Sequence, residues 1–122
     1  MMEVNVVTVG EKKYLAGLPG KKLIQVEDDI RQILELCYEH YTNRVLLYAD
    51  NLSDHFFDLS SGEAGMILGK LSVYQVKAAA VLDLDKVSHS KKFEELVVEL
   101  NRGNDFRIFK DLEKAEKWLL MD

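Results

Sequence analysis

Two adjacent serines, Ser60 and Ser61, carry the hydroxyl groups of this chain that are best placed to accept a phosphoryl group. They precede Gly62, Glu63 and a stretch with helical apolar spacing, so they mark the point where a loop passes into a helix. A phosphoryl group at such a point is stabilised by free backbone N–H groups and by the helix dipole. Ser60 and Ser61 are therefore candidate phospho-acceptors.

The same residues also have a purely structural interpretation. Ser60 and Glu63 are three positions apart and fit a capping box, in which the Ser60 hydroxyl accepts from the Glu63 N–H and the Glu63 carboxylate reaches back. Such a cap stabilises a helix by about 1 kcal/mol and needs no further function. In this interpretation Gly62, Gly65 and Gly69 let the helix lie close to the sheet. The residues alone leave both interpretations open.

Other reactive side chains form weaker patterns. His55, Asp58 and Ser60 include the residue types of a hydrolytic triad, but no Gly-x-Ser-x-Gly elbow accompanies them. Cys37 and His40 are three apart on a predicted helix, which gives at most two metal ligands. No Gly-x-Gly-x-x-Gly motif follows a predicted strand. We therefore predict no catalytic residues, no metal and no cofactor, and we lean against an enzyme.

Four aspartates follow the ends of two predicted central strands: Asp50, Asp54, Asp83 and Asp85. Open α/β sheets place ligands at this edge, and carboxylates there can hold Mg²⁺. Aspartate is also common in loops because its side chain stabilises turns. No phosphate-binding motif accompanies these four, so we favour the turn interpretation.

Composition and charge limit the function classes. The 122 residues, of which 48% are hydrophobic and 30% charged, suit one globular domain over residues 1–122. The net charge of −5 disfavours nucleic acid as a partner, and no apolar stretch approaches the roughly 20 residues of a membrane span. One cysteine and the absence of a signal-peptide pattern at the N-terminus favour the cytoplasm.

Strand-like and helix-like stretches alternate along the chain. Strands are predicted over residues 4–9, 14–16, 44–48, 77–82 and 105–109, and helices over 28–41, 61–75, 90–102 and from Asp111 onward. The inner faces of the first two helices are predicted to include Tyr41 and Tyr74. This order indicates an α/β fold whose mostly parallel sheet carries an N-terminal hairpin and about four helices.

A family resemblance rests on the segment around the serine pair. Arg44–Tyr48, a loop to Asp58 and then Ser60-Ser61-Gly62-Glu63 with a glycine-bearing helix resemble the phosphorylation segment of the STAS family, the anti-sigma-factor antagonist domains. The family usually has aspartate directly before the serine pair, whereas here Leu59 stands there and Asp58 precedes it. The resemblance implies a STAS-like fold, Ser60 as the acceptor, and a kinase or an anti-sigma-like regulator as partner.

A second resemblance extends over the whole chain. Phe56-Phe57-Asp58-Leu59, Ala64-Gly65, Lys70, Tyr74 and Glu99-x-Asn101-Arg102-Gly103 resemble a bacterial family catalogued as domain of unknown function four-one-eight-zero. This resemblance implies a STAS-like fold and supplies no mechanism. It also marks a polar set that would frame a small pocket if the ends of the second and third helices met: Asp58, Lys70, Tyr74, Glu99, Asn101 and Arg102.

Two functions follow as leading expectations, and a purely structural homo-oligomeric module that uses the hairpin edge is a third possibility. The first is a cytoplasmic STAS-like regulatory or protein-binding domain that is switched by serine phosphorylation at Ser60. The alternative is a small enzyme or ligand-binding protein that uses the polar pocket around Asp58, Lys70, Tyr74, Glu99 and Arg102.

Overall fold

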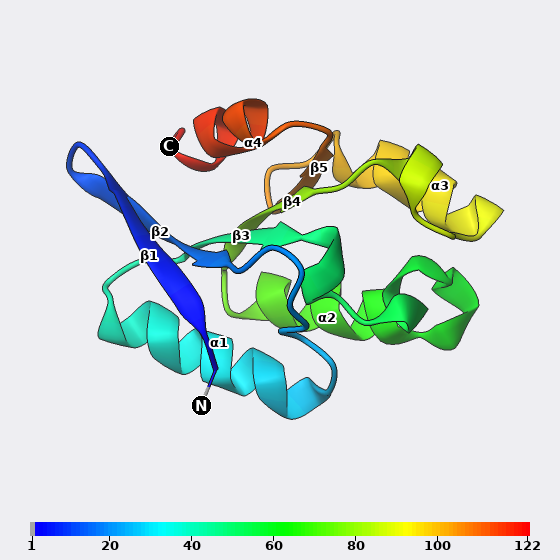
Figure 1. Cartoon of the computed structure of the whole chain (residues 1–122), viewed down its shortest axis with the longest axis horizontal. Helices are drawn as coiled ribbons and strands as arrows, with labels where there is room; N and C mark the ends of the chain where they lie inside the picture. Colours follow the sequence, from blue (N-terminus) through cyan, green and yellow to red (C-terminus); the bar gives the residue numbers. More distant parts are fainter. Residues whose placement is uncertain (1) are drawn as a thin grey trace.

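A five-stranded mixed sheet lies at the centre of the computed structural model, which describes residues 2–122 (Figure 1). Its strands are β1 (Val4–Val9), β2 (Lys12–Gly17), β3 (Arg44–Tyr48), β4 (Lys77–Val81) and β5 (Phe106–Phe109). They lie side by side in chain order, with β1 antiparallel to β2 and every other pair parallel. The predicted α/β class, mostly parallel sheet and N-terminal hairpin are thereby confirmed.

Four α-helices cover the two faces of this sheet: α1 (Glu27–Glu39), α2 (Glu63–Val73), α3 (Lys91–Leu100) and α4 (Leu112–Leu119). The first three belong to the larger apolar core, while α4 packs on the opposite face. Neighbouring parallel strands joined by right-handed crossovers place their helices on one face, which explains this arrangement. Figure 1 shows α4 across the sheet from α1 and α2.

The middle strands are buried on both sides, as their continuous apolar runs predict. Along β3, Val45 and Leu47 face the core of α1 to α3, whereas Leu46 faces Ala115 and Trp118 of α4. Alternation of side chains along a strand therefore divides a single run between two cores.

The first two helices end earlier than predicted. Tyr41 and Gln75 adopt positive φ values of 56° and 57°, so the chain reverses direction at each of them. Thr42 N then donates to Cys37 O at 3.0 Å, and Val76 N donates to Leu71 O at 2.9 Å. The prediction that Tyr41 and Tyr74 face inward is wrong: they are 89% and 59% exposed, because both lie beyond the last helical turn.

Three smaller predictions concern helix faces and caps. Gly65 and Gly69 are exposed, and a Cβ on either would meet nothing within 4 Å, so they do not bring α2 closer to the sheet as predicted. The apolar spacing of the last helix predicts Leu112 on its inner face, but Leu112 is exposed at the start of α4. An aspartate directly before this helical stretch predicts a cap at Asp111, and the structure confirms it, since Asp111 Oδ1 accepts from Lys114 N at 2.8 Å.

None of the helices within residues 2–122 combines the length and the apolar character that crossing a membrane requires.

Candidate functional site

The segment between β3 and α2 is a series of three short 3-10 turns: η1 (Ala49–Asn51), η2 (Asp54–Phe57) and η3 (Leu59–Ser61). Two phenylalanines anchor it, because Phe56 and Phe57 are buried and pack edge-on against Phe93 of α3. The sequence allows either a core position or an exposed contact patch for this aromatic pair and favours the core, which the structure confirms. The anchors hold the hydroxyl-bearing turn η3 on the surface beside the start of α2.

Ser60 lies exposed on η3 and is bound to Asp58. Asp58 Oδ1 accepts from the Ser60 hydroxyl at 2.8 Å and from the Ser60 N–H at 3.2 Å. Asp58 is therefore the cap of this turn, and its carboxylate orients the Ser60 hydroxyl. Ser61 is exposed as well, and its hydroxyl donates to His55 O at 2.6 Å.

The predicted capping box between Ser60 and Glu63 is not formed. The Ser61 hydroxyl, not that of Ser60, accepts from Glu63 N at 3.2 Å. The Glu63 carboxylate instead accepts from the Ser53 hydroxyl. The reason is the extra turn η3 and the left-handed φ of 82° at Gly62, which start α2 at Glu63 rather than at Ser61.

The same turn is tied to the start of α3. Leu59 N donates to Ser90 Oγ at 3.2 Å, and Ser90 N donates to Phe57 O at 3.0 Å. Ser90 is also the N-cap of α3, since its Oγ accepts from Phe93 N at 3.1 Å. Turn η3 thus connects the N-terminal ends of two helices.

A hollow of about 680 Å³ lies beside this turn, at the carboxyl ends of β3 and β4. Its rim carries charged groups of both signs: Lys22, Asp50, Asp54, Asp58, Lys86 and His89. Lys22 Nζ donates to Leu52 O at 2.9 Å and lies 3.1 Å from Asp54 Oδ1. Crevices at the carboxyl ends of parallel strands are the usual ligand sites of open α/β sheets.

His89 lies on the rim of this hollow, and both of its ring nitrogens lie near acceptor oxygens. Its Nδ1 lies 2.7 Å from Val87 O, and its Nε2 lies 3.3 Å from Glu94 Oε1. A carbonyl oxygen can only accept, so Nδ1 carries a proton in this arrangement. The bond to Val87 O and the neighbouring Glu94 carboxylate both raise the pKa of His89.

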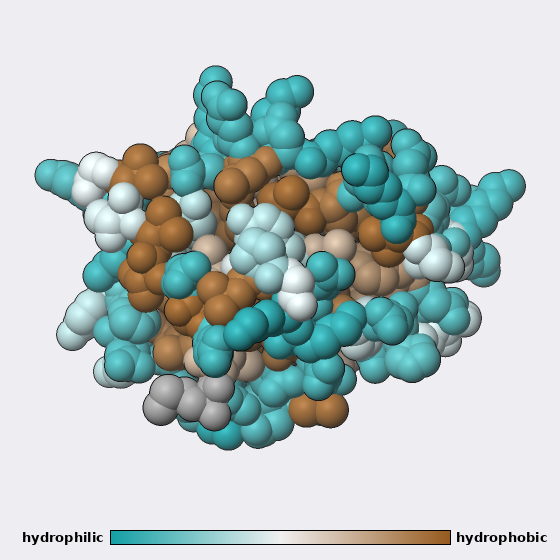
Figure 2. Space-filling view, viewed as in Figure 1, coloured by the Kyte–Doolittle hydropathy of each residue, from teal (hydrophilic) through white to brown (hydrophobic). Residues whose placement is uncertain are grey.

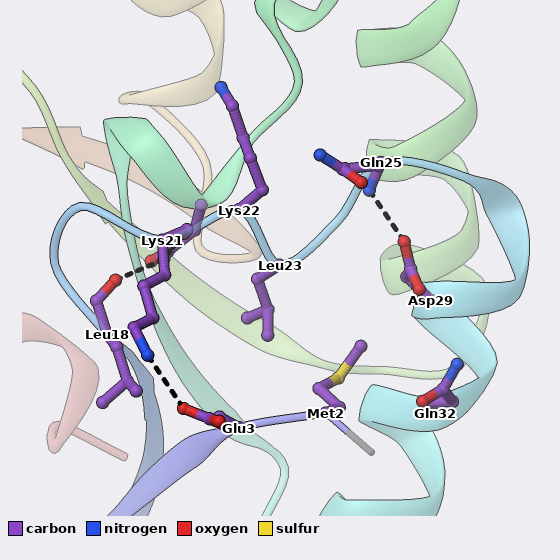
Figure 3. A pocket seen from close by; sticks show the side chains of 10 residues that line it. Met2, Glu3, Leu18, Lys21, Lys22, Leu23, Gln25, Asp29 and Gln32 are labelled. Atoms are coloured by element: carbon purple, nitrogen blue, oxygen red, sulfur yellow. Dashed lines mark hydrogen bonds and ion pairs between the residues drawn. The ribbon is translucent and has the colours of Figure 1, made fainter.

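A second hollow of about 430 Å³ lies at the same edge of the sheet, between the segment after β2 and the start of β1. Figure 3 shows Lys21 reaching across it to Glu3, with Lys21 Nζ 3.2 Å from Glu3 Oε2. Asp29 accepts from Gln25 N at 2.8 Å on the side of α1. Lys22 lines both hollows and lies between them.

Asn51 holds this edge of the sheet together, and the sequence analysis missed it. Its fully buried side chain accepts from Tyr48 N at 2.6 Å and donates to Leu18 O and Lys21 O at 2.8 Å each. Gly17 makes room for it, because a Cβ at Gly17 would overlap the Asn51 amide. Asn51 lies three residues after the end of β3, and no sequence pattern links it to Gly17.

The polar set that was predicted to frame a pocket does not come together in the structure. Asp58 lines the hollow at the carboxyl ends of β3 and β4, whereas Lys70 and Tyr74 line a groove between α1 and α2. The 11 residues of α2 lie between Asp58 and Tyr74 and span about 16 Å. Lys70 pairs with Glu27 at 2.8 Å, and this bond raises the pKa of Lys70.

The other three members of that set lie at the end of α3. Glu99 and Arg102 form an exposed ion pair with 2.9 Å between Arg102 Nη1 and Glu99 Oε1. The Asn101 side chain binds the backbone of β5, because it accepts from Ile108 N at 2.8 Å. These residues therefore stabilise a helix end and its junction with a strand.

Three of the four aspartates near the strand ends, Asp54, Asp83 and Asp85, are paired with lysines. Asp83 and Asp85 lie 4.0 and 3.9 Å from Lys110 Nζ, and Asp83 Oδ1 also accepts from Asp85 N. Cys37 is buried within α1. Across residues 2–122, no three His, Cys, Asp or Glu side chains gather in a group that could hold a metal ion.

Comparison with known proteins identifies a family. A family model described as "Domain of unknown function (DUF4180)" matches residues 9–119, which include every element from β2 to α4. No curated protein and no solved structure matches the chain.

Proposed function

The chain belongs to this family described as a domain of unknown function, and we propose that it is a STAS-like cytoplasmic regulatory domain. It binds another protein, a kinase or an anti-sigma-like regulator, through the surface that runs from Asp58 to Lys70. Phosphorylation of Ser60 changes that surface. The single observation that carries the proposal is the exposed Ser60 hydroxyl, 2.8 Å from Asp58 on a turn that precedes α2.

Phosphorylation of Ser60 would act on this turn in two ways. The phosphoryl group replaces the hydroxyl hydrogen, so the bond from Ser60 Oγ to Asp58 Oδ1 is lost. The added charge of about −1.5 to −2 then lies beside the Asp58 carboxylate and repels it. Asp58 also caps η3 through Ser60 N, so its displacement loosens the turn as well as changing the surface charge.

The change would extend to α3 through one hydrogen bond. Leu59, between Asp58 and Ser60, donates its N–H to Ser90 Oγ, the N-cap of α3. Displacement of η3 therefore breaks this hydrogen bond at the start of α3. A partner that contacts the starts of both α2 and α3 would therefore bind with a different affinity after the modification, because both the shape and the charge of this surface change.

The test combines mass spectrometry with partner recovery. We expect phosphate on Ser60 in protein from its native cell. We also expect the set of partners recovered with Ser60→Asp to differ by at least one protein from the set recovered with the unmodified wild-type protein. Ser72→Asp is the matched control, because Ser72 is an exposed serine on α2 outside the turn. The switch fails if Ser60 stays unmodified and Ser60→Asp leaves every recovered partner in place.

The alternative, a small enzyme or ligand-binding protein, is supported at a different place from the one the sequence suggested. The hollow beside Asp58 has a volume of about 680 Å³, within the range of roughly 300–1,000 Å³ that is typical of small-molecule sites. Ligand-observed NMR with acidic, basic and neutral fragments tests this alternative. Fragment binding to the wild-type protein that both Lys86→Ala and His89→Ala weaken would support this alternative. If no fragment binds the wild-type protein, the alternative is excluded.

A further inference from the structure

Strand β1 forms one edge of the sheet and pairs on one side alone. All six of its residues pair with β2, and β1 stands at one end of the strand order. The backbone N–H and C=O groups that point away from β2 therefore have no strand partner within residues 2–122. Such an edge is a template for pairing with another strand unless it is protected.

The two edges of the sheet differ in this protection. At the opposite edge, β5 has four residues and carries Arg107, whose Nε donates to Gly103 O at 2.7 Å and whose guanidinium lies 5.3 Å from the Trp118 ring. Short length and a charged residue discourage pairing there. Strand β1 has six residues, no charge and no proline.

Strand β1 also exposes apolar side chains. Val6 and Val9 are each 41% exposed. Figure 2 shows apolar surface gathered along the length of the strand, down the left side of the molecule. An uncharged, β-branched edge of this kind is suited to another strand of the same character.

We propose that β1 pairs antiparallel with β1 of a second copy of this chain, about a twofold axis perpendicular to the sheet. The two five-stranded sheets then form one continuous sheet. A twofold interface uses the same patch on both molecules, so a strand without charges can match itself. A charged foreign segment would find no complementary charge on β1.

Symmetry and charge together restrict the register. This axis keeps each face of the sheet on its own side, so directly opposed residues must share a face and their numbers must have an even sum. Pairing centred on Val7 would set Glu3 opposite Glu11 of the other copy, and opposed like charges are destabilising. Pairing centred on Val6 sets Glu3 opposite Val9 and buries the exposed Val6 against its own copy.

The first test measures the oligomeric state of the full chain by sedimentation equilibrium, from micromolar to millimolar concentrations. We expect the wild-type protein to pass from monomer to dimer and Val6→Lys to remain monomeric. Val98→Lys is the matched control, because Val98 is 53% exposed on α3, away from β1, and this variant should dimerise like wild type. If Val6→Lys does not fold, Thr8→Lys, also exposed on β1, replaces it.

The second test measures the register. Under mild oxidation Val6→Cys should form a disulfide-linked dimer, because directly opposed Cβ atoms lie about 4.5–5.5 Å apart. Val98→Cys should remain monomeric, and the buried Cys37 does not compete. A wild-type protein that stays monomeric at all concentrations, a Val6→Lys variant that dimerises, or equal cross-linking of both cysteine variants would overturn the proposal.

Discussion

At the residue scale, one amide holds the carboxyl edge of the sheet in place. Asn51 binds Tyr48 at the end of β3 and both Leu18 and Lys21 in the segment that follows β2. Its backbone oxygen also accepts from Ile24 N at 2.8 Å. Leu18, Lys21 and Asn51 all line the hollow of about 430 Å³, so one wall of that hollow depends on these bonds.

We predict that Asn51→Ala lowers the free energy of unfolding by about 3 kcal/mol, because it leaves buried backbone groups without partners. Gly17→Ala should lower it by about 1–3 kcal/mol, since the new Cβ overlaps the Asn51 amide. Urea unfolding followed by circular dichroism measures both values. The control is Gly65→Ala on α2, where a Cβ would meet nothing within 4 Å. Gly20 also has space for a Cβ, but its positive φ would strain an alanine, so it is not a suitable control.

The double variant tests whether the two residues form one unit. In Gly17→Ala/Asn51→Ala the new methyl group enters space that the amide has left. Its destabilisation should therefore be smaller than the sum of the two single effects. Simple additivity of the two losses would show that Gly17 is required for another reason.

The sequence predicted part of the serine site at this scale. A hydroxyl pair before a helical stretch predicts an exposed Ser60, and the structure has it exposed. The bond from Ser60 to Asp58 could not be predicted, because the turn η3 depends on Phe56 and Phe57 packing on Phe93, far along the chain. Local signals favoured a capping box, and these distant contacts exclude it.

At the element scale, α1 and α2 end in the same way. Each is followed by a residue other than glycine at positive φ, Tyr41 after α1 and Gln75 after α2. Asn43 Nδ2 donates to Gln75 O at 3.1 Å, so the two ends also contact each other. Left-handed geometry costs an L-residue roughly 1–2 kcal/mol, and glycine adopts it without that cost.

We predict that Gln75→Gly raises the free energy of unfolding by about 1 kcal/mol. Tyr41→Gly should also stabilise the protein, but by less, because it removes the ring that lies 6.0 Å from Lys13 Nζ. Thermal and urea unfolding of both variants measure the effect.

Tyr38→Gly is the control for this prediction. Tyr38 is 86% exposed, much like Tyr41, but it lies inside α1. Glycine inside a helix destabilises by roughly 0.5–1 kcal/mol, so this substitution should have the opposite sign. Equal signs for Tyr38→Gly and Tyr41→Gly would contradict the role assigned to the positive φ.

At the scale of the whole molecule, apolar periodicity was enough to predict the order of strands and helices. The runs Arg44–Tyr48 and Val4–Val9 were predicted with the bounds that β3 and β1 have. The helix ends were less accurate, because a reversal at Tyr41 or Gln75 carries no glycine signal. Contacts between distant segments, such as Gly17 with Asn51, leave no local pattern at all.

The large core also determines how the single thiol titrates. Cys37 lies in the cluster that α1 to α3 form with the sheet, and burial raises its pKa from an ordinary value of 9.0 to about 11. The native state therefore holds the thiol proton to a higher pH than the unfolded chain does. Linkage requires that the stability this group contributes is complete below pH 9 and is lost as the pH rises toward 11.

We predict that the wild-type protein loses stability relative to Cys37→Ala as the pH rises above 9. Other groups also change the stability with pH, including Tyr14, whose pKa is raised by burial and by Glu116 and whose contribution to stability therefore declines as the pH rises. These groups are common to both proteins and cancel in the difference. Urea unfolding of both proteins between about pH 8 and about pH 10.5 gives that difference. A difference that stays constant over this range would mean that the thiolate is no less stable in the folded core than in water, and that the core around Cys37 admits solvent.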